Sequence, residues 1–183
     1  MTTLVYLYSH PFYPFTIPHI SHMQTSSNQA ASTEENEIVL GKGMGPLKFG
    51  ASMDEVRALM GEPEEIEESE DDDEFEHQAW NYLEEGYSLY FDREDDYRLS
   101  CIETDHPGIR LYGEAIHGKT PEEIQDLMKR HGHEQSDVEK MDTGEMRLSY
   151  EKEMIDLYFD ENQLQFVNFG VFINDDLEVQ WPA

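Results

Sequence analysis

The side chains best suited to chemistry in this sequence are carboxylates, and many of them lie in one stretch. Residues 62–76 contain 11 Asp and Glu side chains in 15 positions. Such a run can bind a basic protein surface or imitate nucleic-acid phosphates, or it can be a solvated loop. It lacks the glycine and terminal glutamate of an EF-hand calcium loop. The carboxylates at its centre are candidate interface residues: Glu70, Asp71, Asp72, Asp73 and Glu74.

Histidine and cysteine give no pattern typical of a catalytic or metal site. His131 and His133 flank Gly132 at the end of an expected helix, where a cationic imidazole is favourable in itself. Cys101 is the single cysteine, which excludes an internal disulfide and a two-thiolate zinc site. There is no glycine-rich phosphate loop, serine nucleophile elbow or two-histidine zinc helix. We therefore expect no metal, no cofactor and no enzyme activity.

Two short helices are expected to position these side chains. Ser52 and Glu55 have the spacing of a capping box, and so do Thr120 and Glu123. Apolar residues then follow at the i, i+3, i+4 spacing that places them on one helix face. These residues are Val56, Leu59 and Met60 in the first helix and Ile124, Leu127 and Met128 in the second.

Strands are expected after each helix, because apolar and polar residues alternate with period two. Tyr87, Leu89 and Phe91 alternate with Ser88 and Tyr90. The segment at residues 155–159 alternates in the same way. Aromatic and branched residues in this pattern favour strands with one buried face, and short connections favour antiparallel hairpins.

The pattern occurs twice at a constant spacing of 68 residues. Gly50 corresponds to Gly118, and the run LYFD at residues 89–92 corresponds to LYFD at residues 157–160. A common spacing across helical and strand segments indicates internal duplication. We therefore predict an α+β fold of two tandem copies of a helix plus antiparallel β-meander. Residues 1–36 form a disordered tail in this prediction, residues 37–105 the first repeat and residues 106–183 the second.

A family resemblance rests on residues 50–63. A glycine, a hydroxyl residue, two acidic residues and an aliphatic residue precede the run LMGEP at residues 59–63, and an aromatic strand follows. This resembles the repeat of β-lactamase inhibitor proteins and of small outer-membrane assembly lipoproteins, over roughly residues 40–170. The resemblance implies helices packed on an antiparallel sheet and a scaffold often used to bind proteins. The single cysteine departs from both groups, which have disulfides or a lipidated cysteine, so the β-lactamase target is not carried over.

Tyr90 and Tyr158 are further interface candidates. They occupy equivalent positions and point away from the Leu and Phe side chains of their strands. If the helices cover the Leu and Phe face, the tyrosines lie on the opposite sheet surface, where tyrosine is a frequent binding residue. The alternative is that they pack between the repeats or under the segment that contains Trp181.

The net charge of −29 narrows the class of partner. A field of this sign repels nucleic acid and anionic membranes and attracts basic proteins. No apolar run approaches the length of a membrane span, and no Lys or Arg precedes Lys42 as in a secretory signal, so we expect a cytoplasmic protein. The function expected is an acidic protein-binding module, of the inhibitor or immunity type, that blocks a basic partner. The alternatives are a structural or regulatory component of an assembly, and a ligand-binding protein or enzyme with a site between the repeats.

Overall fold

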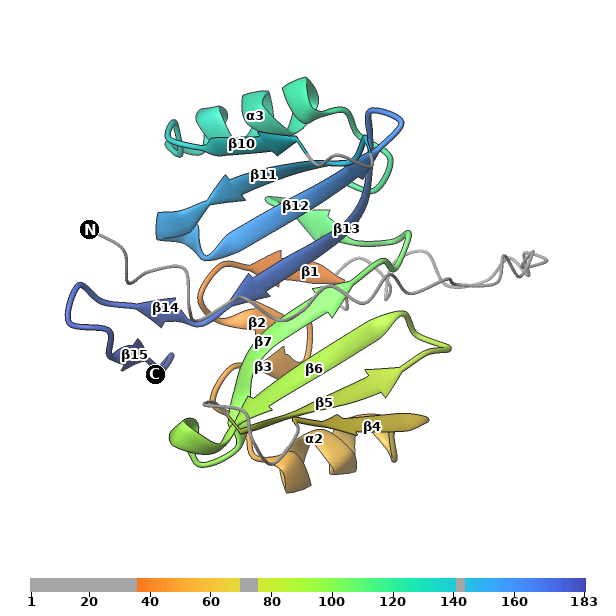
Figure 1. Cartoon of the computed structure of the whole chain (residues 1–183), viewed down its shortest axis with the longest axis vertical. Helices are drawn as coiled ribbons and strands as arrows, with labels where there is room; N and C mark the ends of the chain where they lie inside the picture. Colours follow the sequence, from red (N-terminus) through yellow and green to blue (C-terminus); the bar gives the residue numbers. More distant parts are fainter. Residues whose placement is uncertain (1–35, 70–75, 141–143) are drawn as a thin grey trace.

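The computed structural model describes residues 36–69, 76–140 and 144–183, and its main feature is a sheet of eight strands. Their order is β10-β11-β12-β13-β7-β6-β5-β4, and every neighbouring pair is antiparallel (Figure 1). The strands are β4 (Glu65–Glu68), β5 (His77–Tyr82), β6 (Tyr87–Asp92), β7 (Arg98–Thr104), β10 (Asp137–Lys140), β11 (Met146–Tyr150), β12 (Ile155–Asp160) and β13 (Gln163–Gly170).

A second layer lies behind this sheet. It contains a five-stranded sheet in the order β3-β2-β1-β8-β9, in which β1 and β8 are parallel. Its strands are β1 (Glu37–Val39), β2 (Gly43–Met44), β3 (Leu47–Lys48), β8 (Arg110–Leu111) and β9 (Glu114–Ala115). Figure 1 shows β1–β3 behind the middle of the large sheet, with helix α3 at the β10 end and helix α2 at the β4 end. The remaining elements are 3-10 helices η1 (Arg93–Asp95) and η2 (Glu151–Glu153), and a hairpin of β14 (Phe172–Ile173) and β15 (Val179–Gln180).

The two α-helices among the described residues begin where the capping boxes predict. α2 spans Met53–Met60 and α3 spans Pro121–Arg130. The backbone N–H of Ser52 donates to Glu55 Oε2 at 2.8 Å, and the N–H of Thr120 donates to Glu123 Oε2 at 2.8 Å. Neither helix has the length and apolar character needed to cross a bilayer.

The hydrophobic core lies between the large sheet and the second layer. Strands β6 and β12 contribute alternate side chains to it, as period-two strands with one buried face must. β7 and β13 each contain an extra residue at a register shift, so their core residues, such as Leu99 and Ile102, do not alternate strictly. The five-stranded sheet and the helices supply the opposing side chains. Central members with no measurable exposure are Leu89, Phe91, Ile102, Ile109, Leu111, Ile124, Leu127, Leu157 and Val167.

The expected α+β class is wrong, because the chain is mostly β. Strands account for 45% of the structure and helices for 17%. Three groups of short strands lie outside the expected meanders: β1–β3, β8–β9 and the hairpin β14–β15. Most of these strands have two residues, too few to show a period of two. Edge strands β4 and β10 are also mostly charged, so their sequences favour loops.

The first described residue, Asn36, lies within the segment expected to be a tail. Residues 1–35 are outside the described residues. Asn36 is 8% exposed, and its side-chain oxygen accepts a hydrogen bond from the Tyr87 hydroxyl at 2.6 Å. This bond connects the residue before β1 to the first residue of β6.

Two matched leucine substitutions test the assignment of the core. Leu89 is 0% exposed, whereas Leu83 is 55% exposed. We expect Leu89→Ala to lower the free energy of unfolding by about 2–5 kcal/mol, because it leaves a cavity. Leu83→Ala should change it by less than about 0.5 kcal/mol. Urea unfolding followed by circular dichroism measures both, and equal losses would contradict this arrangement.

Candidate protein-binding face

The face of the eight-stranded sheet that points away from the core, here called the outer face, carries a straight row of polar residues. Each of the eight strands contributes one residue, and each residue is the direct register partner of the next. We call this set the polar row. From β4 to β10 it consists of Glu65, Asn81, Ser88, Glu103, Asn168, Asp156, Ser149 and Asp137. Half of these positions are carboxylates, and none is Lys or Arg.

The carboxylates of the polar row differ in exposure. Glu65 and Asp137, on the edge strands, are exposed. Glu103 and Asp156, on central strands, are half-buried. A half-buried carboxylate loses part of its hydration and needs hydrogen bonds or a cation in exchange. Glu103 and Asp156 are therefore the two carboxylates of the polar row whose ionised forms most need such partners.

Asp156 has a cationic partner. Arg147 Nη2 donates to Asp156 Oδ2 at 2.7 Å, and Arg147 Nη1 lies 3.5 Å from Glu139 Oε2. Burial is the largest single effect on the pKa of Arg147 and lowers it. The hydrogen bond and the charge of Asp156 contribute to a larger opposite effect, so the net pKa is raised. The charge of Asp156 is thus balanced within the sheet.

Glu103 has weaker stabilising contacts than Asp156. Its Oε2 accepts from Asn168 Nδ2 at 3.4 Å, and Asn168 Oδ1 in turn accepts from the Cys101 thiol at 3.2 Å. Among the described residues no Lys or Arg forms an ion pair with Glu103. Burial raises the pKa of Glu103, the nearby charge of Asp105 adds to this, and the hydrogen bond from Asn168 opposes it.

The two expected interface tyrosines lie on the outer face, on opposite sides of the polar row. Tyr90 follows Ser88 on β6 and is the register partner of Cys101, whereas Tyr158 follows Asp156 on β12 and is the partner of Phe166. β6 and β12 run in opposite directions, which places the two side chains on different sides. The Tyr158 and Phe166 rings stack with centroids 4.3 Å apart.

Both tyrosines are half-buried. Burial is the largest cause that raises the pKa of each hydroxyl far above its usual range, and the charge of Glu103 contributes to both shifts. The Tyr90 and Tyr158 hydroxyls therefore remain protonated donors at neutral pH. They lie within the electrostatic reach of Glu103.

The remaining expected interface residues cannot be placed. Glu70, Asp71, Asp72, Asp73 and Glu74 lie outside the described residues. Earlier in the same acidic stretch, residues 65–68 form strand β4, which pairs with β5. This part of the stretch is an ordered edge strand, not a loop.

The histidines after α3 connect three elements. His131 is the C-cap of α3, and its ring stacks on Tyr112 with centroids 3.9 Å apart. His133 Nε2 lies 2.6 Å from the Tyr112 hydroxyl, and His133 Nδ1 lies 2.7 Å from Glu153 Oε1. These contacts join the β8–β9 turn, the end of α3 and η2. No group of His, Cys, Asp or Glu within the described residues could hold a metal ion.

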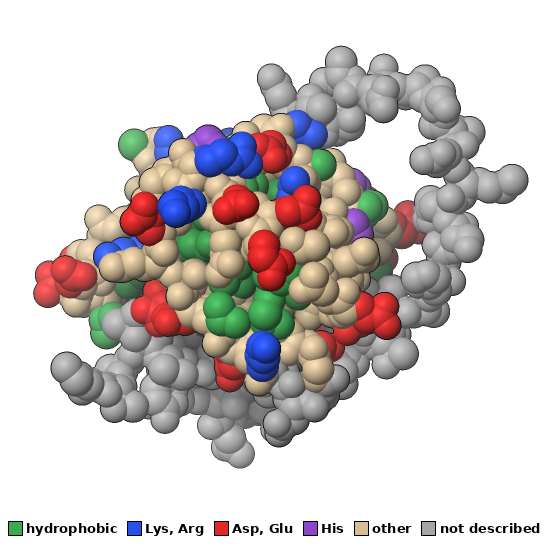
Figure 2. All heavy atoms as spheres, turned by 90° about the horizontal axis from the view of Figure 1, so that it is seen from above, with side chains coloured by type: hydrophobic (Ala, Val, Ile, Leu, Met, Phe, Trp, Pro, Cys, Tyr) green, Lys and Arg blue, Asp and Glu red, His purple; other side chains and the backbone are tan. Residues whose placement is uncertain are grey.

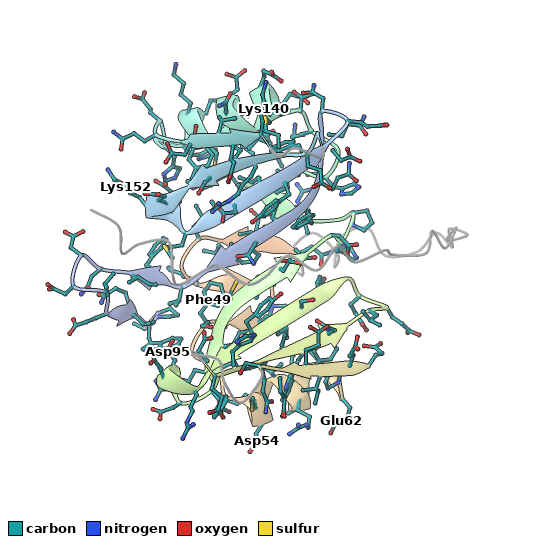
Figure 3. All side chains as sticks on the ribbon, viewed as in Figure 1. Phe49, Asp54, Glu62, Asp95, Lys140 and Lys152 are labelled. Atoms are coloured by element: carbon teal, nitrogen blue, oxygen red, sulfur yellow. The ribbon has the colours of Figure 1, made fainter. Side chains whose placement is uncertain are left out.

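Charges are mixed at the α3 end of the molecule. Figure 2, which views this end from above, shows Lys and Arg side chains interspersed with Asp and Glu. Figure 3 labels Lys140 and Lys152 towards this end and Asp54 and Glu62 at the α2 end. The polar row, with four carboxylates and no Lys or Arg, differs from this mixed surface.

The polar row itself was not predicted from the sequence. In the sequence, its members are marked only as polar residues that lie beside buried ones, such as Ser88 beside Leu89. Period-two alternation identifies these positions. The missing information was the strand order and register, which bring Glu103 and Asn168 together although 65 residues separate them.

Comparisons with known proteins give limited similarity. No protein-family model matches the chain, and no curated protein matches it. An extracellular protein containing an SCP domain from Bacillus anthracis is 17% identical with a TM-score of 0.43, and the match covers 83% of this chain and 50% of that one. A DUF4309 family protein (YjgB) from Bacillus subtilis is 19% identical with a TM-score of 0.44, covering 77% of this chain and 90% of that one. The chain thus spans about half the length of the first of these proteins.

The substitution Glu103→Gln tests whether the ionised carboxylate of Glu103 lowers the stability of the fold. Because burial raises the folded-state pKa of Glu103, its ionised form destabilises the fold. This penalty is absent at a pH below the unfolded-state pKa and complete above the folded-state pKa. We expect Glu103→Gln to be more stable than wild type at about pH 8, by a margin that shrinks towards about pH 5.

The measurement is urea unfolding at several pH values, with Glu122→Gln as the control. Glu122 is an exposed carboxylate in the first turn of α3. Its substitution should cost less than about 1 kcal/mol and show no comparable pH-dependent gain. A Glu103→Gln protein that is less stable than wild type at about pH 8 would refute the proposed environment.

Proposed function

We propose that the chain is an acidic protein-binding module whose outer face binds a basic partner protein, in the manner of an inhibitor or immunity protein. The observation that carries the proposal is the polar row, which places four carboxylates and no Lys or Arg in one line across the sheet. Binding would cover the basic surface of the partner and block its activity.

The charge distribution supports this proposal. The whole chain has a net charge of −29, which accelerates the encounter with a basic protein and slows that with nucleic acid or an anionic membrane. On the outer face, Glu67 and Glu139 lie beside the polar row, as partners of Ala79 and Arg147. Complementary charges of this kind set the orientation of a partner more than they add affinity.

Aromatic residues supply the apolar part of the proposed interface. Tyr90, Tyr158 and Phe166 lie near the centre of the outer face, with acidic side chains towards both edge strands. Binding energy in protein interfaces is concentrated in such central aromatic groups, while the polar rim excludes water and selects partners.

A site between the two halves of the large sheet gains no support from the structure. β7 and β13 are hydrogen-bonded neighbours over four residue pairs. Their core-facing residues Ile102, Val167 and Phe169 are at most 1% exposed.

We propose that the protein acts in the cytoplasm. The thiol of Cys101 is free and buried, which is compatible with a reducing compartment. The partner expected there is a basic protein, and neither a nucleic acid nor a membrane.

Two variants with the same change in net charge test the proposed face. The outer-face variant neutralises four exposed carboxylates on the edge strands: Glu65→Gln, Glu67→Gln, Asp137→Asn and Glu139→Gln. The control variant neutralises four exposed carboxylates elsewhere: Asp54→Asn, Glu122→Gln, Glu161→Gln and Asp175→Asn. The probe is a blocked octa-arginine peptide, with binding measured by isothermal titration calorimetry at about 50 mM and about 300 mM NaCl.

We expect the outer-face variant to bind the peptide about tenfold more weakly than wild type at low salt, since four screened charge interactions together are worth on the order of 1.4 kcal/mol. The control variant should stay within about twofold of wild type. Equal losses in both variants would show that only net charge matters, and that outcome would refute the proposed face.

A further inference from the structure

We propose that the turn between β7 and β8 is a pH-sensitive latch, which the neutral side chain of His106 holds closed and which opens when that side chain is protonated. The turn comprises residues 105–109, and through it the chain passes from the large sheet to the second layer. The inference is independent of the outer face and goes beyond the proposed function in protein binding.

The central contact of the latch is a hydrogen bond between the backbone and an imidazole ring. The Gly108 N–H donates to His106 Nδ1 at 2.9 Å. Nδ1 accepts this bond through its lone pair, which it has only while it carries no proton. A protonated imidazole has a hydrogen on both ring nitrogens, so two N–H donors would then face each other. The bond from Gly108 and the protonated ring therefore exclude each other.

Close packing around Gly108 defines the position of the ring. A Cβ atom at residue 108 would lie 2.8 Å from His106 Cε1 and 3.1 Å from Asn36 Nδ2, so a side chain here would displace the ring. On another side, the centroid of the His106 ring lies 5.9 Å from that of the Tyr87 ring. The ring is thus half-buried among these neighbours and has lost part of its contact with water.

Several backbone hydrogen bonds depend on the shape of this turn. The His106 N–H donates to Thr104 Oγ1 at 3.1 Å, and the Ile109 N–H donates to the His106 carbonyl oxygen at 3.1 Å. The next residue, Arg110, donates its N–H to the Asn36 carbonyl oxygen at 2.9 Å and begins β8, the parallel partner of β1. Opening of the latch would therefore loosen the pairing of β1 with β8 in the second layer.

The groups around His106 have opposing effects on its protonation. Burial is the largest effect and lowers the pKa of His106, because it disfavours the charged ring. Asp105, on the same turn, raises this pKa, and His117, which follows β9, lowers it. Of the other neighbours, Asn36 has no ionisable group, and a tyrosine such as Tyr87 ordinarily ionises near pH 10. The net shift is downward, so the ring is neutral and the latch is closed at about pH 7.5.

The direction of this shift sets the pH range in which the latch opens. The folded-state pKa of His106 lies below the unfolded-state value of about 6.5. The neutral ring therefore contributes fully to stability above about pH 6.5. This contribution decreases as the pH falls below about 6.5, and it is lost below the folded-state pKa. The latch is closed in a neutral medium and opens in a mildly acidic one.

Hydrogen exchange at the Gly108 amide tests the latch, because this N–H is the donor of the central bond. We expect its protection factor, corrected for the pH dependence of intrinsic exchange, to fall about tenfold in wild type between about pH 7.5 and about pH 4.5, the scale set by loss of one hydrogen bond. His106→Asn supplies a side-chain oxygen as acceptor and does not titrate in this range, so its protection should change less than about twofold.

The matched control is His117→Asn, the same substitution at an exposed histidine. Its Gly108 amide should show the roughly tenfold fall of wild type. A second readout is the titration of the His106 ring in wild type by nuclear magnetic resonance. We expect a pKa below the ordinary value of about 6.5. This measurement needs no substitution, so it is decisive even if His106→Asn does not fold.

Three results would overturn the inference. They are a Gly108 protection factor that does not depend on pH in wild type, an equal fall in wild type and His106→Asn, and a His106 pKa at or above about 6.5. None of them bears on the outer face, whose test is peptide binding to variants of the edge strands. Failure of the latch and failure of the proposed function are therefore distinguishable.

Discussion

The pairing of β7 with β13 is the interaction on which the rest of the structure depends. It joins residues 101–104 to residues 167–170 by antiparallel hydrogen bonds and makes one sheet of eight strands from two groups of four. Without it the core would be divided, and each group would be of a size at which burial of apolar surface is marginal. The same pairing places Glu103 opposite Asn168 and so completes the polar row.

On the outer face, the burial of central side chains opposes the hydration of their charged groups. Its central side chains are partly removed from water, yet they include carboxylates that water would otherwise stabilise. The fold balances Asp156 with Arg147 and supports Glu103 through the amide of Asn168. A neutral residue at this position would avoid the cost of burying a carboxylate that has no cationic partner. The basic partner proposed above would supply a counter-charge for this carboxylate.

Sequence patterns predicted the local elements better than their assembly. The capping boxes at Ser52 and Thr120 located both helices, because capping depends on residues three positions apart. Period-two alternation likewise identified β6 and β12 and assigned Tyr90 and Tyr158 to the face opposite the buried residues. The α+β class was wrong because short strands such as β8 are held by pairing with distant segments, and their own residues show no strand pattern. The polar row was also inaccessible, since its members become neighbours only through strand order and register.

The two edge strands also control how copies of this protein meet one another. β4 and β10 end the large sheet, and each has four exposed residues that are charged except for Ile66 or Val138. An open strand edge can pair with another sheet, and dense charge of one sign on β4 opposes that through mutual repulsion. β10 carries both signs, with Lys140 beside its acidic residues, so its edge has the weaker protection. Association through sheet edges would therefore favour two molecules joined by their β10 edges, and it would stop at the pair because only the repelling β4 edges remain open.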